Sequence, residues 1–347
     1  MTSNTPAAHG FRMPAEWHPH ERTWMAFPTE NPTFDSPEHL HAGREAWARV
    51  ADTIARYEPV TLVVNTGESE DARKYVSADV EIVERPLNDA WMRDIGPSFL
   101  IDGKGGVAAA DWIFNGWGAQ SWARWDKDEQ IAEHITGLTG VQRFASRLIN
   151  EGGGIHVDGE GTVLVTDTVQ LGEGRNSDWT REEVEAELHA FLGTTKAIWL
   201  PRGLTRDYDE FGTRGHIDIV ASFVRPGVVV AHVQPDPSHP DHEVCRELVA
   251  ILRAATDAQG RRLEVIELPA PTVLLDEEGE PVDYSYINHY VANGAVILCA
   301  FADPRDEEAA AILAEAYPGR TVELVDAREI FANGGGIHCI TQQQPKA

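Results

Sequence analysis

Cys339 is the residue of this sequence best suited to covalent chemistry. It follows a run of three glycines that includes Gly335, and glycines let the backbone approach a ligand closely. Polar groups flank the thiol, as they do at reactive cysteines. The other two cysteines, Cys245 in an expected helix and Cys299 in an apolar strand, are typical of a core. We therefore expect Cys339 to react and Gly335 to lie against the ligand.

His216 and Asp218 form a second candidate pair, because they stand two residues apart in a stretch that should be extended. Alternate residues of a strand point to the same face, so an imidazole for proton transfer would lie beside a carboxylate that binds a cation or tunes the imidazole. The competing interpretation is a buried histidine with satisfied hydrogen bonds and an aspartate at a sheet edge. The pair alone leaves both interpretations open.

Asp94 and Glu151 occupy positions that match Asp218 in other repeats of the sequence. Taken separately, each is an ordinary loop carboxylate. Three carboxylates at equivalent repeat positions would converge on one pocket, and burying them is costly unless a cation compensates their charge. A planar guanidinium matches carboxylates through paired, charge-assisted hydrogen bonds. The three acidic residues therefore predict a site for a small guanidino cation.

Tryptophans gather in the loop-like sequence that follows Trp91, and the whole chain has ten of them. Most tryptophans fill a core or its rim. One or two can wall an active site, where the ring face attracts a cation and excludes water. We expect Trp91, three residues before Asp94, and Trp117 to have this role.

The spacing of potential ligands argues against a metal or nucleotide site. The sequence has no Cys-x-x-Cys, His-Glu-x-x-His or calcium-loop pattern, and His338 would point away from Cys339 if the chain were extended there. The two glycine triplets are not followed by Lys-Ser/Thr and do not fit Gly-x-Gly-x-x-Gly after a strand. We expect no metal and no organic cofactor.

The composition excludes several classes of protein. The 347 residues include 29 basic and 56 acidic side chains, a net charge of −27, which argues against nucleic acid as a partner. With 42% hydrophobic residues the chain can bury a large core. No secretory signal is visible at the N-terminus, and no apolar run is long enough to span a membrane. Three widely spaced cysteines do not suggest a disulfide framework, so we expect a cytoplasmic protein.

The hydrophobic pattern predicts strands and helices that alternate along the chain. Four times an apolar strand is followed by a helix and a second strand. The helix at 180–192 has the clearest signals, because Thr180 and Glu183 have the spacing of a capping box. The expected strand, helix and strand lie at 60–64, 68–75 and 80–83; 161–165, 180–192 and 197–200; 228–230, 241–255 and 264–268; and 294–298, 307–316 and 322–325. Loops are expected at 30–38, 235–243 and 277–283.

Internal repetition indicates how these units are arranged. The letters Gly-Gly-Gly-Ile-His occur at 152–156 and again at 334–338. Polar anchors lie near residues 94, 151, 216, 288 and 334, so the pattern predicts about five α/β modules. A cyclic arrangement would bring the five anchors to one axis. We therefore expect one pseudo-symmetric domain over residues 1–347 rather than two domains.

Four blocks in this order resemble the agmatine deiminase family, which includes the bacterial peptidylarginine deiminases as close relatives. They are Asn88-Asp-Ala-Trp-Met-Arg-Asp-Ile-Gly-Pro97, Glu151-Gly-Gly-Gly-Ile-His-Val-Asp-Gly-Glu-Gly-Thr162, Gly215-His-Ile-Asp218 and Ile337-His-Cys-Ile-Thr-Gln-Gln-Gln-Pro345. Shorter blocks at 16–21 and 200–204 also match, so the resemblance spans nearly the whole chain. It implies a five-bladed α/β propeller, or pentein, of ββαβ-type modules, in agreement with the five modules counted above.

The resemblance also implies the chemistry. Cys339 matches the nucleophile, His216 the general acid/base, and Asp94 and Asp218 the carboxylates that hold the guanidinium, with Glu151 as a further acidic residue of the site. A thiouronium adduct on the cysteine would form with release of ammonia and would then be hydrolysed. The implied reaction converts agmatine and water to N-carbamoylputrescine, on the way to putrescine and polyamines, without any cofactor.

Two residues depart from the family pattern. The residue before Gly-His-x-Asp is usually acidic and the residue before Ile-His-Cys is usually Asn, whereas this chain has Arg214 and Gly336. A cation at 214 would disfavour the ammonium of agmatine and favour a carboxylate tail, unless Asp207, Asp209 or Glu210 neutralises it. Arg214 is thus either a substrate-binding residue or a surface residue paired with this acidic loop.

Three alternatives to agmatine deimination stay open at this point. The substrate can be another guanidino compound, such as a guanidino acid, arginine or an arginyl peptide. The chain can also be a non-catalytic guanidine-binding homologue, or a metallohydrolase. In every deiminase interpretation the partner is a small cationic guanidino substrate, with no nucleic acid and no membrane, and a homo-oligomer is compatible with the sequence.

Overall fold

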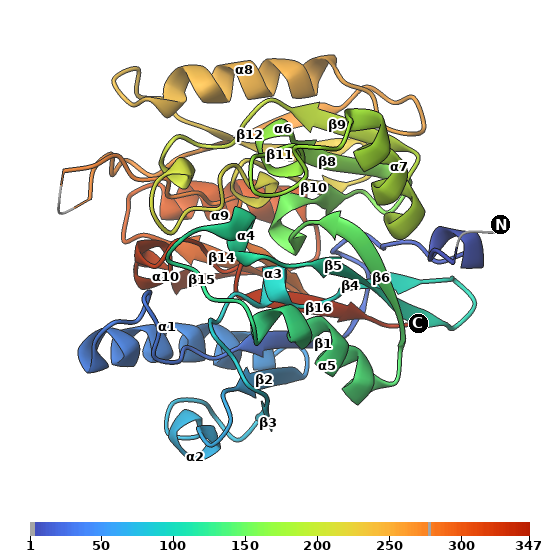
Figure 1. The fold of residues 1–347 in the computed structure, drawn as a ribbon. Coiled ribbons are helices and arrows are strands. Elements are labelled where there is room, and N and C mark those ends of the chain that lie inside the picture. The colour runs from blue at the N-terminus through green and yellow to red at the C-terminus, as the bar shows by residue number, and fades with distance from the viewer. Residues whose placement is uncertain (1–3, 277–278) are drawn as a thin grey trace.

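The computed structural model describes residues 4–276 and 279–347. Within these residues the strands form five small sheets, which together with the connecting helices give a mixed α/β fold (Figure 1). Four sheets share one plan, in which the first strand is antiparallel to the second and the second is parallel to the third. They are β4 (Ser98–Ile101), β5 (Val107–Ile113) and β6 (Gln142–Ile149); β7 (His156–Val157), β8 (Thr162–Thr166) and β9 (Lys196–Leu200); β10 (Ala221–Arg225), β11 (Val228–Val233) and β12 (Glu264–Pro269); and β13 (Tyr290–Ala292), β14 (Ala295–Ala300) and β15 (Thr321–Asp326).

The fifth sheet joins the two ends of the chain. Its order is β16 (Thr341–Pro345), β1 (His20–Ala26), β2 (Val60–Val64) and β3 (Val80–Glu84). β16 is antiparallel to β1, whereas β1, β2 and β3 are parallel to one another. The last strand therefore completes a unit that the first strands begin, and this unit repeats the plan of the other four.

The longer helices connect the parallel strands, since a tight hairpin can join only antiparallel ones. They are α1 (Pro37–Ala55), α5 (Ile131–Thr139), α7 (Arg181–Leu192), α8 (Asp241–Ala254) and α9 (Asp306–Ala316). The short helices are α2 (Ser69–Ala72), α3 (Met92–Ile95), α4 (Gly116–Ala119), α6 (Asp167–Gln170) and α10 (Arg328–Ala332). Figure 1 shows α1 and α8 at opposite sides of the molecule, with α3 between them. In the part of the chain that the structure describes, no helix has both the length and the apolar character needed to cross a membrane.

Three of the four expected helices are confirmed to within one residue at each end, as α7, α8 and α9. Thr180 caps α7 and forms the expected capping box with Glu183. The helix expected at 68–75 is shorter, because α2 ends at Ala72 and the chain continues as turns. The predicted loop at 235–243 gives way to α8 at Asp241, and residues 277–278 of the third predicted loop lie outside the described residues.

Helix α1 is the largest element that the sequence analysis misses. It begins inside the stretch 30–38 that we interpreted as a loop, and Ser36 caps it by accepting the N–H of His39. Trp47, Val50 and Ile54 of its buried face have helical spacing and are fully buried in the largest apolar cluster of the protein. This periodicity was a readable signal for the helix.

A short polar segment precedes the first strand of each sheet. The five segments are α3 before β4, the 3-10 turn η3 (Gly152–Gly154) before β7, the 3-10 turn η5 (Ile217–Ile219) before β10, residues 285–289 before β13, and residues 337–340 before β16. Helix α3 packs on η3, and η3 packs on η5. The candidate residues therefore lie just before the first strands of small sheets in a mixed α/β fold.

Candidate active site

Cys339 lies in the tight turn between α10 and β16, with only 5% of its surface exposed. The amide nitrogen of Asn288 donates to its sulfur at 3.2 Å, and Oδ2 of Asp218 lies 3.5 Å from the sulfur. The amide oxygen of the same asparagine accepts the backbone N–H groups of His338 and Cys339 at 2.9 and 3.3 Å. Asn288 therefore holds the cysteine turn in place from the neighbouring repeat.

The Cys339 thiol is neutral near pH 7 as long as nothing compensates the charges around it. Burial raises its pKa well above the ordinary value, and the negative charges of Asp218 and Asp94 raise it further. The backbone N–H of Gly336 and the amide of Asn288 oppose this shift without reversing it. A cation placed between the carboxylates would remove the main obstacle to the thiolate.

His216 is held as a cation among carboxylates. Burial by itself lowers its pKa, but Asp94, Glu151 and Asp218 outweigh burial and raise the pKa to about 9. Its Nε2 lies 3.3 Å from Glu151, which in turn accepts two hydrogen bonds from Nε of the fully buried Arg175 at 3.0 and 3.1 Å. Nδ1 is buried without a hydrogen-bond partner, 3.9 Å from Asp94. The imidazolium thus has a proton to give at Nδ1.

The main chain around His216 is fixed by the buried carboxylate of Asp207. This carboxylate accepts the backbone N–H groups of Thr213, Gly215 and His216, and the Thr213 hydroxyl. His216 and Asp218 are therefore not in a strand, as we expected, but on a 3-10 turn with His216 as its first flanking residue. Both still point into one site, because the turn is anchored by these hydrogen bonds.

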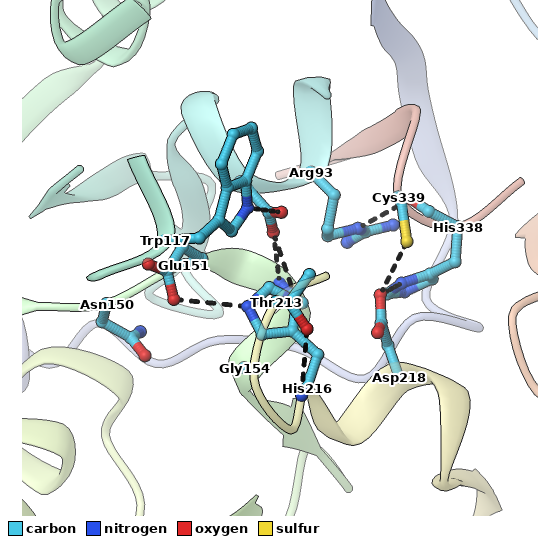
Figure 2. A network of polar contacts seen from close by, with 12 residues as sticks. Arg93, Trp117, Asn150, Glu151, Gly154, Thr213, His216, Asp218, His338 and Cys339 are labelled. Atoms are coloured by element: carbon cyan, nitrogen blue, oxygen red, sulfur yellow. Dashed lines mark hydrogen bonds and ion pairs between the residues drawn. The ribbon is translucent and has the colours of Figure 1, made fainter. Parts of the chain in front are cut away.

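The two substrate-facing carboxylates have different partners. Oδ2 of Asp94 accepts the indole N–H of Trp117 at 2.8 Å, and Oδ1 accepts the N–H of Gly153 at 2.9 Å. Oδ2 of Asp218 is 2.8 Å from Nδ1 of His338, while Oδ1 is buried without a partner. Figure 2 shows His338 and Cys339 meeting at Asp218 on one side, with His216 and Trp117 on the other.

Gly153 marks the point where the acid and base groups converge. A Cβ atom at this position would lie 2.4 Å from Nδ1 of His216, 2.9 Å from Oδ2 of Asp218 and 3.0 Å from Oδ1 of Asp94. At Gly335 a Cβ would lie 3.0 Å from the Cys339 sulfur. Glycine at both positions lets the imidazole, the carboxylates and the thiol approach the backbone this closely.

A narrow pocket lies over the thiol. The rings of Trp117 and Trp122 stack at 5.3 Å, and Phe211 packs on Trp122 at 4.9 Å. The lining residues are Trp91, Asp94, Trp117, Trp122, Phe211, Thr213, Gly334 and Cys339. Trp91 and Trp117 thus wall the pocket, and no basic side chain belongs to its lining.

Arg214 is not brought into this pocket. Its backbone has a left-handed φ of 68° and its N–H donates to the carbonyl of Asp207. Within residues 4–276 and 279–347 its guanidinium makes no hydrogen bond or ion pair, so the expected pairing with the acidic loop is not present either. The structure therefore supports neither of the two interpretations of Arg214.

The sequence analysis did not predict several polar residues of the site. His338 lies beside Cys339 in a tight turn rather than an extended strand, so both side chains reach Asp218. Glu16 and Arg93 stand in blocks that carry the family resemblance, which was the available signal for them. Arg175 lies in a loop without any such signal. Among the described residues no group of three or more His, Cys, Asp or Glu side chains could hold a metal ion.

The arrangement defines a class of protein: an α/β protein with a buried thiol, an imidazolium and several carboxylates around a slot for a small planar cation. A model of the Porphyromonas-type peptidyl-arginine deiminase family matches residues 12–345. A Streptomyces avermitilis protein that is provisionally assigned as an agmatine deiminase is 66% identical over 345 residues, 99% of each chain. The agmatine deiminase of Pseudomonas aeruginosa is 40% identical over 369 residues, which cover 99% of this chain and 98% of that one.

Solved structures agree with these relatives. The agmatine deiminase of Enterococcus faecalis superimposes with a TM-score of 0.92 at 33% identity, covering 100% of this chain and 99% of that one. The chain therefore belongs to the agmatine deiminase family.

Proposed function

We propose that this protein hydrolyses agmatine to N-carbamoylputrescine and ammonia. The observation that carries the proposal is the convergence, beside Gly153, of an imidazolium nitrogen and two carboxylates, one of which, Asp218, also adjoins the Cys339 thiol. A guanidinium is the small cation whose flat shape and donors fit such a slot. The relatives named agmatine deiminases support this substrate.

In this proposal Asp94 and Asp218 hold the guanidinium from two sides. Oδ2 of Asp218 lies beside Gly153 and 3.5 Å from the Cys339 sulfur, where it can accept an N–H of the guanidinium. Asp94 is turned toward the same space by Trp117 and Gly153. Binding fixes the guanidinium carbon near the sulfur and supplies the orientation on which the reaction depends.

The bound cation activates the nucleophile. Its charge offsets the two carboxylates that raise the pKa of Cys339, so the thiol releases its proton to solvent as the substrate binds. The thiolate then forms a bond to the guanidinium carbon. The carbon becomes tetrahedral, and its nitrogens stay hydrogen-bonded to the carboxylates, which stabilise the charge that they carry.

His216 moves the protons. Its Nδ1 gives a proton to the leaving nitrogen, the carbon–nitrogen bond breaks, and ammonia departs from a thiouronium adduct on Cys339. The neutral imidazole then takes a proton from water, and the resulting hydroxide adds to the same carbon. Collapse of this second tetrahedral species expels the thiolate and leaves the ureido product. A pKa of about 9 keeps the imidazole protonated for the first of these steps.

The pocket lining favours an ammonium tail over a carboxylate tail. Aromatic rings of Trp91, Trp117, Trp122 and Phe211 offer faces to a cation, and no basic residue of the lining would pair with a carboxylate. This supports agmatine over guanidino acids. The position of Arg214 outside the lining adds no preference for an acidic tail.

The finer architecture is part of the same proposal. We infer that the five sheets surround a common axis as a five-bladed propeller, and that residues 1–347 act as a single catalytic domain. The packing of α3 on η3 and of η3 on η5 supports this, because it links consecutive repeats around the site. Free thiols at Cys245, Cys299 and Cys339 support a cytoplasmic location.

The test is ammonia release by the purified protein with agmatine, arginine, 4-guanidinobutyrate and an arginyl peptide. Agmatine should be turned over by the wild type and by Cys245→Ala, a buried cysteine far from the site, but not by Cys339→Ala. A chelator should leave the rate unchanged. Preference for a carboxylate-bearing substrate would mean that the enzyme is a deiminase for a guanidino acid and not for agmatine. Loss of activity with the chelator would favour a metallohydrolase. A folded protein that binds agmatine without releasing ammonia would be a guanidine-binding homologue.

A further inference from the structure

A chain of buried charges extends behind Asp218, away from the substrate. Nδ1 of His338 lies 2.8 Å from Oδ2 of Asp218, and Nε2 lies 2.7 Å from Oε1 of Glu16. Glu16, His338 and Asp218 are 5%, 2% and 2% exposed. Nη1 of the buried Arg93 is 3.5 Å from the same oxygen of Glu16. The signs along this chain alternate, so four charges are buried together with each next to its opposite.

His338 must carry two ring protons to make both short contacts. An ionised carboxylate only accepts hydrogen bonds, and the ring has an ionised carboxylate at each nitrogen. The charges agree with this: burial opposes ionisation of Asp218 and Glu16, yet the charges of His338 and Arg93 help to hold both pKa values below the ordinary range. The two carboxylates in turn outweigh burial and Arg93 and raise the pKa of His338.

His156 supplies a comparison inside the same cluster, because it occupies the same place as His338 in the repeated Gly-Gly-Gly-Ile-His sequence. The two rings are 6.3 Å apart, and Nε2 of His156 faces Glu16 at 3.6 Å. Its Nδ1, however, accepts the backbone N–H of Phe223 at 3.2 Å and so carries no proton. Equivalent histidines of two repeats therefore differ in charge because their partners differ.

We propose that His338 is a buried imidazolium, held by Glu16, that acts as a positioning residue: it keeps Asp218 ionised and fixes its carboxylate with Oδ2 beside Gly153 and the Cys339 sulfur. This role rests on the proposed function. The ring touches neither the substrate slot nor the sulfur, and it acts only through Asp218. The groups that face it are Asp218 from η5, Glu16 from the N-terminal segment, Arg93 from α3 and His156 from β7.

The first measurement is the protonation of His338 itself, by nitrogen-15 NMR of the histidine rings in the wild-type protein near pH 7.5. His338→Asn assigns its signals by their loss. We expect two N–H groups on His338 and one on His156. A single N–H on His338 would overturn the proposal, whatever the enzyme does with agmatine.

The second measurement separates positioning from stability by means of Glu16→Gln. This variant keeps the shape of the side chain and removes the charge that holds the imidazolium. We expect KM for agmatine to rise about tenfold with a much smaller change in kcat, and the acid limb of kcat/KM to move up by about one pH unit. Glu58→Gln is the matched control, since Glu58 is another buried glutamate bonded to a buried histidine, His20, at 3.0 Å.

The two measurements distinguish a failure of the positioning role of His338 from a failure of the proposed function. If Glu58→Gln reproduces the shift, or if Glu16→Gln folds and shifts nothing, the positioning role is wrong. If the wild type releases no ammonia from agmatine, the proposed function is wrong and the positioning role falls with it, while the NMR result still decides whether His338 is an imidazolium. A Glu16→Gln variant that fails to fold leaves the decision to the NMR measurement.

Discussion

The two carboxylates that face the substrate slot have opposite electrostatic surroundings. Asp94 is bonded to neutral donors, the indole of Trp117 and the backbone of Gly153. Burial raises its pKa above the ordinary value, and the charges of Asp218 and Glu151 add to the shift. Asp218 is equally buried, but the imidazolium of His338 outweighs burial and lowers its pKa. The pKa values of the two neighbouring carboxylates are thus shifted in opposite directions.

The opposite pKa shifts of Asp94 and Asp218 show how a site can bind a cation while limiting the negative charge that is buried before the cation arrives. Two fully charged carboxylates beside a thiol would repel each other and would prevent the thiolate from forming. Here His338 stabilises the charge of Asp218. The charge of Asp94 is opposed by burial and is stabilised by the neighbouring His216 imidazolium, to which a bound guanidinium would add. The bound substrate therefore completes the electrostatic balance of the site.

The largest loss of activity is expected from Gly153→Ala. This substitution places a methyl group against both carboxylates and Nδ1 of His216. We expect kcat/KM for agmatine to fall by about 1,000-fold, because the imidazole must move and the slot is filled. Steady-state kinetics checks this. Gly154→Ala is the control, since its methyl would meet Val169 at 3.0 Å and none of these groups. Equal losses in both variants would mean that Gly153 is not at the reaction centre.

A second prediction is that removing the charge of Asp218 lowers the free energy of unfolding more than removing the charge of Asp94. At about pH 6, Asp218→Asn should lower the free energy of unfolding by about 3 kcal/mol, because it leaves the His338 imidazolium without its partner. Asp94→Asn should cost less than Asp218→Asn, because burial already disfavours the charge of Asp94; the cost that remains comes from the amide, which accepts only one of the two N–H groups that Asp94 accepts. Urea denaturation of both variants checks the contrast.

The pH dependence of this contrast has a definite sign. The lowered pKa of Asp218 stabilises the fold at pH values above the pKa of this group in the unfolded chain, and this stability is lost in acid. The raised pKa of His338 stabilises the fold at pH values below the pKa of the unfolded chain, and this stability is lost as the pH rises through the pKa of the folded protein. The cost of Asp218→Asn should therefore be greatest between these limits. A cost that is the same for both aspartates would remove the distinction between them.

The smallest effect is expected from Trp117→Phe, which removes the indole donor to Asp94. Losing a donor to the charged form raises the pKa of Asp94, so the acid limb of kcat/KM should move to higher pH by roughly half a unit, within the ~1 kcal/mol of one hydrogen bond. Trp112→Phe is the matched control, because its indole donates to Ser98 at 2.9 Å in another part of the core. A shift of equal size in both variants would refute the role of the indole.

Much of the fold and of the site was readable in the sequence. Helices α7, α8 and α9 had clear caps or periodicity, and the repeated polar anchors led to Cys339, His216, Asp94, Asp218 and Glu151, all of which the structure brings together. Helix α1 was missed although its apolar spacing is regular. The extended conformation expected at His216 was wrong because Asp207 bends that segment into a turn.

The amino-acid sequence by itself indicated that Asp94, Glu151, His216, Asp218 and Cys339 belong to one site, because they stand in polar anchors of repeated units. Only the tertiary structure decided how these side chains are charged. His338 contacts Asp218 and Glu16, which are 120 and 322 positions away in the chain, and its twin His156 contacts a backbone N–H instead. A protonation state depends on partners within a few ångströms and on burial, and neither is encoded by local sequence. The same letters, Gly-Gly-Gly-Ile-His, therefore place one histidine between two carboxylates and the other against a backbone N–H.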